Sequence, residues 1–88
     1  MEEKIVDARW TTIIKEFLIA EYSDDVYGRR KGIKKMNHLR LNLAERDLFR
    51  QEFDRLEAEL IGKTEPELTV IKKQWQQEIV SEKVGKGN

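Results

Sequence analysis

The chain has no cysteine, one proline and one histidine among its 88 residues. Without cysteine there is no disulfide bond, no thiolate nucleophile and no thiolate ligand for a metal. The longest apolar run is the four residues of 17–20, far short of the roughly 20 that a membrane-spanning helix needs. The first residues, Met1-Glu2-Glu3, are acidic where a secretory signal would be basic. We therefore expect a cytoplasmic protein that does not bind membranes.

Charge is abundant but unevenly distributed. The 17 basic and 17 acidic residues cancel, yet residues 29–40 hold six basic residues and no acidic one, while residues 1–28 and 41–62 are both acidic. Such a segment could contact phosphates or an acidic partner, or simply neutralise the acids of its own chain. The six candidate contact residues are Arg29, Arg30, Lys31, Lys34, Lys35 and Arg40.

The clearest helix signal covers residues 42–61. Asn42 is a favourable N-cap, and Glu45 three residues later completes a capping box. Gly62 stands where a helix end needs a residue that tolerates positive φ. The apolar residues of this segment recur at spacings of four, three and four, which places them on one helix face; they are Phe49, Phe53, Leu56 and Leu60.

Two further helices are predicted over residues 3–22 and 65–84, followed by a frayed tail at 85–88. Thr64 and Glu67 form a second capping box, with Pro66 in the first turn. Both helices carry an apolar stripe: the first has Val6, Trp10, Ile13, Phe17 and Ala20, and the second has Leu68, Ile71, Trp75 and Ile79. Five large aromatic residues are expected in the core: Trp10, Phe17, Phe49, Phe53 and Trp75.

These segments predict one all-α domain over residues 1–88, a small antiparallel three-helix bundle that a second copy could complete. The short connection before residue 65 favours antiparallel packing of the last two helices. Residues 28–41 are expected to form a basic connection, with Gly28 and Gly32 bracketing a mobile loop. Within it, 33–41 is either helical or irregular, or a short strand paired with another copy.

No catalytic constellation is visible, so the protein is predicted not to be an enzyme. His38 is the only histidine, and neither a metal site, a cofactor nor a small-molecule substrate is indicated. The leading hypothesis is a small non-enzymatic protein-interaction module, such as an adaptor, inhibitor or regulatory subunit. It would bind another protein or a second copy through a helix face, with Ile5, Ala8 and Ile19 as candidate contacts because they lie off the main stripe.

The alternative hypothesis is a nucleic-acid-binding regulatory protein that uses the basic segment 29–40. Tyr27 next to this segment could stack on a base. A helix-turn-helix arrangement of the last two helices is disfavoured, because Glu65 and Glu67 would face the bases.

Overall fold

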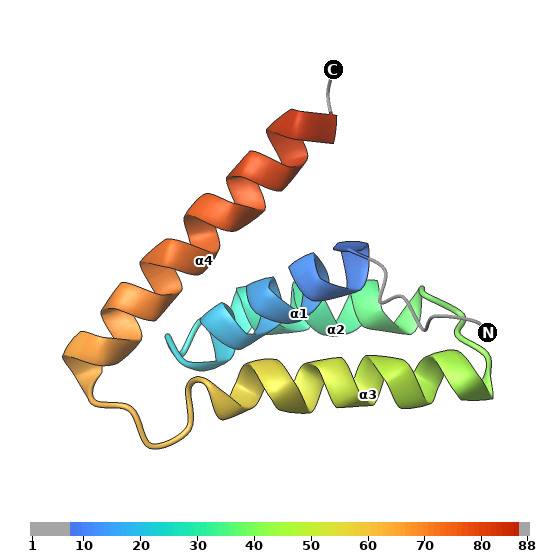
Figure 1. Cartoon of the computed structure of the whole chain (residues 1–88), viewed down its shortest axis with the longest axis horizontal. Coiled ribbons are helices and arrows are strands. Elements are labelled where there is room, and N and C mark those ends of the chain that lie inside the picture. The colour runs from blue at the N-terminus through green and yellow to red at the C-terminus, as the bar shows by residue number, and fades with distance from the viewer. Residues whose placement is uncertain (1–7, 87–88) are drawn as a thin grey trace, which may run out of the picture.

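The computed structural model describes the backbone of residues 8–86 and the side chains of residues 8–81. In this part of the chain there are four helices and no strand (Figure 1): α1 (Ala8–Glu21), α2 (Val26–Asn37), α3 (Leu43–Ala58) and α4 (Glu65–Lys86). The predicted all-α class is confirmed. The prediction of three helices is wrong, because the basic segment forms a helix of its own, α2.

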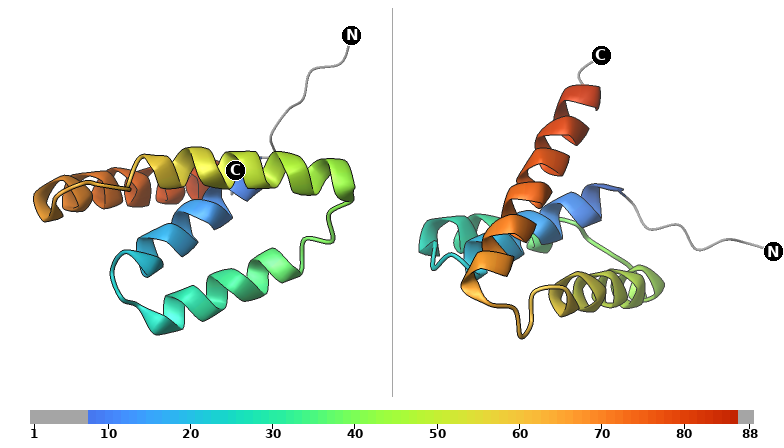
Figure 2. Two further views of the ribbon diagram at one scale, coloured as in Figure 1. Left: turned by 90° about the horizontal axis from the view of Figure 1, so that it is seen from below. Right: turned by 60° about the vertical axis from the view of Figure 1, so that its left-hand side comes forward.

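The helix α1 is central, and each of the other three helices packs on it. It lies between α2 and α3 when the molecule is seen from below, and α4 rises away from α3 (Figures 1 and 2). Among α2, α3 and α4, no two bring their backbones close together. The predicted antiparallel packing of α4 on α3 is therefore wrong, since α4 turns its apolar face to α1 instead.

The core is built around Ile14 and Leu18 of α1, which are both fully buried. Leu56 and Leu60 reach them from α3 and its end, and Leu68 and Trp75 reach them from α4. The apolar faces predicted for 42–61 and 65–84 are thus confirmed. On α1 the predicted stripe is buried at Trp10 and Ala20, and Ile14 and Leu18 beside it are buried most deeply.

Aromatic pairs join α1 to α3. The rings of Trp10 and Phe49 meet edge to face with centroids 5.9 Å apart, and those of Phe17 and Phe53 are tilted at the same separation. Trp10 and Trp75 are buried, and the three phenylalanines are half-buried. The predicted aromatic core is therefore present, with its phenylalanines along the α1–α3 contact.

Both predicted capping boxes are confirmed. The Glu45 N–H donates to Asn42 and the Asn42 N–H donates to Glu45, at 2.8 and 3.0 Å. At the start of α4, the Thr64 backbone N–H donates to the Glu67 carboxylate at 2.9 Å, and this bond lowers the pKa of Glu67. Gly62 has the positive φ expected of it, 78°, so the chain can reverse between α3 and α4.

The basic segment begins as a helix rather than as the predicted loop. Asp25 caps α2 by accepting a hydrogen bond from the Gly28 N–H at 3.0 Å. The helix continues through Gly32 and ends at Asn37, so 33–41 is helical in its first half and irregular after it. Two glycines disfavour a helix by about 1 kcal/mol each relative to alanine. A tertiary contact must therefore offset this cost.

That contact is the close approach of α2 to α1. A Cβ atom on Gly28 would lie 2.9 Å from the Ala20 Cβ, and one on Gly32 would lie 3.0 Å from the Phe17 Cβ. Any side chain at these positions would push the two helices apart. The glycines, four residues apart on one face, therefore let α2 lie directly against α1.

Gly28→Ala is expected to destabilise the protein by about 1–2 kcal/mol, because the cost of overpacking exceeds the gain in helix propensity. The free energy of unfolding in urea measures this. In an Ala20→Gly background the cost of Gly28→Ala should shrink, since the opposing Cβ is gone. The exposed Lys34→Ala is the control, with an expected change within about 0.5 kcal/mol. A Gly28→Ala variant more stable than the parent would contradict the close contact.

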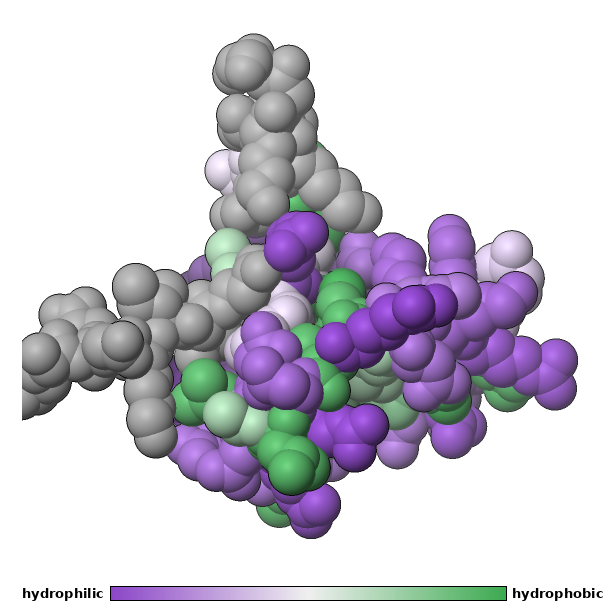
Figure 3. All heavy atoms as spheres, turned by 90° about the vertical axis from the view of Figure 1, so that its right-hand side faces the viewer, coloured by the Kyte–Doolittle hydropathy of each residue, from purple (hydrophilic) through white to green (hydrophobic). Residues whose placement is uncertain are grey.

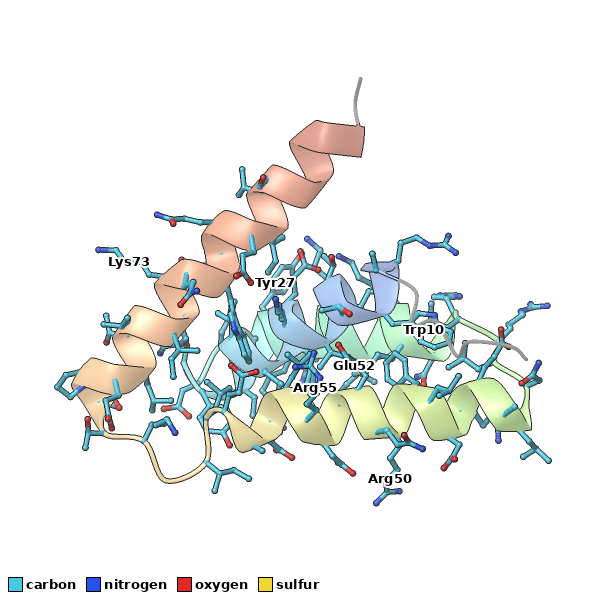
Figure 4. All side chains as sticks on the ribbon, in the orientation of Figure 1. Trp10, Tyr27, Arg50, Glu52, Arg55 and Lys73 are labelled. Carbon is cyan, nitrogen blue, oxygen red and sulfur yellow. The ribbon has the colours of Figure 1, made fainter. Side chains whose placement is uncertain are left out.

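A buried carboxylate ties α3 to α1. Glu52 is only 8% exposed and accepts hydrogen bonds from Thr11 of α1 at 3.0 Å and from Arg55 at 2.8 and 3.0 Å. Figure 4 shows Glu52 and Arg55 side by side on α3, next to α1. The hydrogen bonds from Arg55, helped by that from Thr11, lower the pKa of Glu52 below its ordinary value of 4.5.

Because the pKa of Glu52 is lower in the folded state, the ionised carboxylate stabilises the folded protein fully above about pH 4.5. This stabilisation is lost as the pH falls through the folded-state pKa of Glu52. We expect Glu52→Gln to lose roughly 1–3 kcal/mol of unfolding free energy at pH 7. The difference from the parent should narrow as the pH falls below about 4.5. Asp54→Asn, at an exposed pair with Arg50, is the control and should change little. An unchanged difference across this pH range would refute the role of the Glu52 charge.

Candidate functional site

The side of α2 that faces away from α1 carries cations around an exposed aromatic ring. Tyr27 is 76% exposed, and Arg30, Lys31 and Lys34 follow it at spacings of three, four and seven residues. These four side chains border the same outward surface, as the helical period requires. In Figure 3, polar side chains project on the side where α2 lies. We call Tyr27, Arg30, Lys31 and Lys34 the α2 outer face.

The six predicted basic residues fall into two groups. Arg29 and Lys35 point back toward α1, where Arg29 pairs with Glu21 at 3.1 Å and Lys35 pairs with Glu16 at 3.0 Å. The other four form no ion pair within the described side chains; they are Arg30, Lys31, Lys34 and Arg40. Two of the six cations are thus neutralised within the chain, by acidic residues of α1.

Arg40 and His38 lie beyond the end of α2. The His38 backbone N–H caps the helix by donating to the Lys34 carbonyl, while its side chain is exposed. Arg40 is also exposed and has a left-handed φ of 52° in the connection to α3. Among the described residues, no group of three or more His, Cys, Asp or Glu side chains could hold a metal ion.

A groove of about 680 Å³ opens where α4 diverges from α2. α1 contributes Ile19 and Ala20 to it, and α4 contributes Ile79 and Val80. Lys31 and Gly28 line the α2 side. The groove therefore combines apolar and polar side chains, and three helices build it from segments that are far apart in sequence.

Most charges at the rim of the groove are already engaged. Glu16 pairs with Lys35, and Asp25 accepts the Gly28 N–H. Lys31 is the exception within the described residues, since it has no carboxylate partner there.

Between residues 69 and 81 the exposed side of α4 has little charge, which the sequence patterns did not reveal. Seven of its nine exposed residues between 69 and 81 are uncharged, in a chain where 39% of residues are charged. Val70 and Val80 are 65% and 59% exposed. Figure 4 shows Lys73 pointing away from the body of the molecule. The available signal was the polar, uncharged run around Trp75, which reads Gln74-Trp75-Gln76-Gln77.

Two of the three apolar residues predicted as a protein interface, Ala8 and Ile19, lie within the described residues. Ile19 is half-buried, packs against the core and lines the groove. Ala8 is exposed at the start of α1, and Ile5 lies outside the described residues.

The helix α4 is held against α1 and its end by two lysines as well as by apolar contact. Lys15 pairs with Glu78 at 2.6 Å, and its ammonium lies 5.7 Å from the centre of the Trp75 ring. Lys72 of α4 donates to the Tyr22 carbonyl and to the Ser23 hydroxyl, at 3.3 and 3.0 Å. The angle that opens the groove is therefore held by specific polar contacts at the end of α1.

No protein-family model, curated protein or solved structure matches this chain. In the described part of the chain, none of the helices has the length and apolar character needed to span a membrane.

Proposed function

We propose that the protein is a small non-enzymatic interaction module that assembles with a second copy of itself through α4 and the adjoining groove. The observation that carries this proposal is the exposed, nearly uncharged side of α4 beside an apolar groove. Depletion of charge is the compositional feature that distinguishes the core of a protein interface from the remaining surface. An adaptor, an inhibitor or a regulatory subunit would all use such a surface.

Val80 is the residue on which the proposed contact between the two copies depends. This side chain is 59% exposed and lines the groove beside Ile79 and Ile19. Covering it would remove apolar area from water at about 25 cal/mol per Å². A helix lying in the groove could contact Val80 of α4, Ile19 of α1 and Gly28 of α2 together, because all three residues line it.

A second copy of the chain fits this surface because α4 lines the groove and also extends away from the other helices. The far end of the 22-residue α4 extends away from the other helices (Figure 1). A two-fold axis beside α4 would place the end of each α4 in the groove of the other copy, and the same residues would serve both subunits.

The size of the chain also favours association. A domain of this length buries only about 60–65% of its unfolded surface, and its net stability is small. Within the described residues, the backbones of α2, α3 and α4 come close to that of α1 and not to one another. A helix from a second copy would add the neighbour that α4 lacks on its free side.

We expect Val80→Asp to raise the dissociation constant of the dimer by about tenfold or more, since a carboxylate would be buried without a partner. Sedimentation velocity over a wide range of protein concentration measures this constant. Circular dichroism tests whether the variant remains folded.

Val70→Asp is the matched control, because Val70 is equally exposed on the same helix but does not line the groove. It should leave the dissociation constant unchanged. A parent protein that stays monomeric at the highest concentration would overturn the proposal, as would equal effects of the two substitutions.

A further inference from the structure

We propose that the α2 outer face binds single-stranded nucleic acid, with Arg30, Lys31 and Lys34 on the phosphates and Tyr27 stacked on a base. This activity uses a different surface from the α4 groove and rests on different observations. Only Lys31 borders both surfaces.

The first observation is the division of the cations. Arg29 and Lys35 are occupied by Glu21 and Glu16, so the acids of α1 that could have neutralised the helix are engaged. Arg30, Lys31 and Lys34 remain without a carboxylate partner in the described structure. Unpaired cations at neighbouring positions of one helix face provide positive potential that complements a polyanion.

The second observation is the position of Tyr27. The ring is 76% exposed, which leaves its aromatic face open to a ligand. It borders the same surface as the three cations. A base that stacks on an exposed ring contributes to binding whatever its identity, and it must be unpaired to do so. The combination of one ring and three cations therefore favours a single strand over a duplex.

The third observation is the support beneath this surface. Gly28 and Gly32 bring α2 directly against α1, and the pairs with Glu21 and Glu16 fix its rotation. The cations are therefore carried on a positioned helix rather than on a loop, so less conformational freedom is lost on binding.

The charge of the rest of the molecule limits where a polyanion can bind. The acidic residues of α3 lie on the opposite side of α1 from α2 (Figure 2). A polyanion is attracted to α2 and repelled from α3, so binding is confined to one face although the net charge of the chain is zero.

An anionic membrane is a poorer match for the same face. Binding in a lipid interface requires a continuous apolar side that enters the acyl region. Here Tyr27, the most exposed apolar side chain of α2, shares its surface with three cations, and Ile33, at 43% exposure, is the one aliphatic side chain that borders the same surface. The surface is therefore suited to contacts of its cations with phosphates and of its single ring with a base.

The test is a fluorescence-anisotropy titration with a labelled thymidine oligonucleotide of about 20 residues, which cannot pair with itself. Three contacted phosphates predict a slope of log K against log salt of about −2. Arg30→Ala, Lys31→Ala and Lys34→Ala combined should weaken binding at low salt by about tenfold or more and bring the slope close to zero. Tyr27→Ala should weaken binding by roughly tenfold, while Tyr27→Phe keeps the ring and should change it little.

The matched control removes three cations elsewhere, with Arg46→Ala, Arg50→Ala and Lys63→Ala combined. All three residues are exposed, and none belongs to α2. Equal weakening by this variant would overturn the proposal, because attraction would then depend only on net charge. Circular dichroism and sedimentation on each variant separate loss of binding from loss of folding or of self-association.

Three other results would overturn the proposal: no binding at low salt, tighter binding of a duplex of the same length, or binding of phosphatidylserine vesicles without binding of the oligonucleotide. The Val80→Asp variant, titrated in the same way, should bind the oligonucleotide through each single chain. Failure of the dimer and failure of nucleic-acid binding are thus distinguishable.

Discussion

The burial of Ile14 and Leu18 is the interaction on which the remaining structure depends. These two side chains are fully buried, and α1, which carries them, is the helix that α2, α3 and α4 share. Each of the outer helices is held by its own contact with α1: glycines for α2, aromatic pairs and Glu52 for α3, and Trp75 with Lys15 for α4. Loss of the central helix would therefore release all three, because they have no close contact with one another that could replace it.

The packing of three helices around α1 also explains why large parts of α2 and α4 remain exposed. In a closed four-helix bundle each helix has two neighbours and one exposed side. Here α2 and α4 each have one neighbour, so a large part of their circumference is exposed. On α2 that part holds Tyr27 and three cations without a carboxylate partner in the described structure, and on α4 it holds Val80 and a run of uncharged polar residues. The two surfaces differ in chemistry, which is why we assign them different partners.

The contact between α1 and α2 links the fold to the charge pattern. Because Gly28 and Gly32 allow α2 to approach so closely, Arg29 and Lys35 come within reach of Glu21 and Glu16. The same rotation directs Arg30 and Lys34 away from the protein. A change at the glycines would therefore alter both stability and the direction of the cations, although neither glycine has a side chain that could touch a ligand.

The sequence by itself determined the features that depend on near neighbours. Asn42 with Glu45, and Thr64 with Glu67, bond across three residues, and the apolar faces of α3 and α4 follow from spacing along one helix. Only the tertiary structure decided that 26–37 is helical, since two glycines disfavour a helix until Phe17 and Ala20 lie against them. It also decided which cations are neutralised and where the groove opens. Those properties depend on contacts such as that of Thr11 with Glu52, 41 residues apart, and local spacing carries no information about such distant pairs.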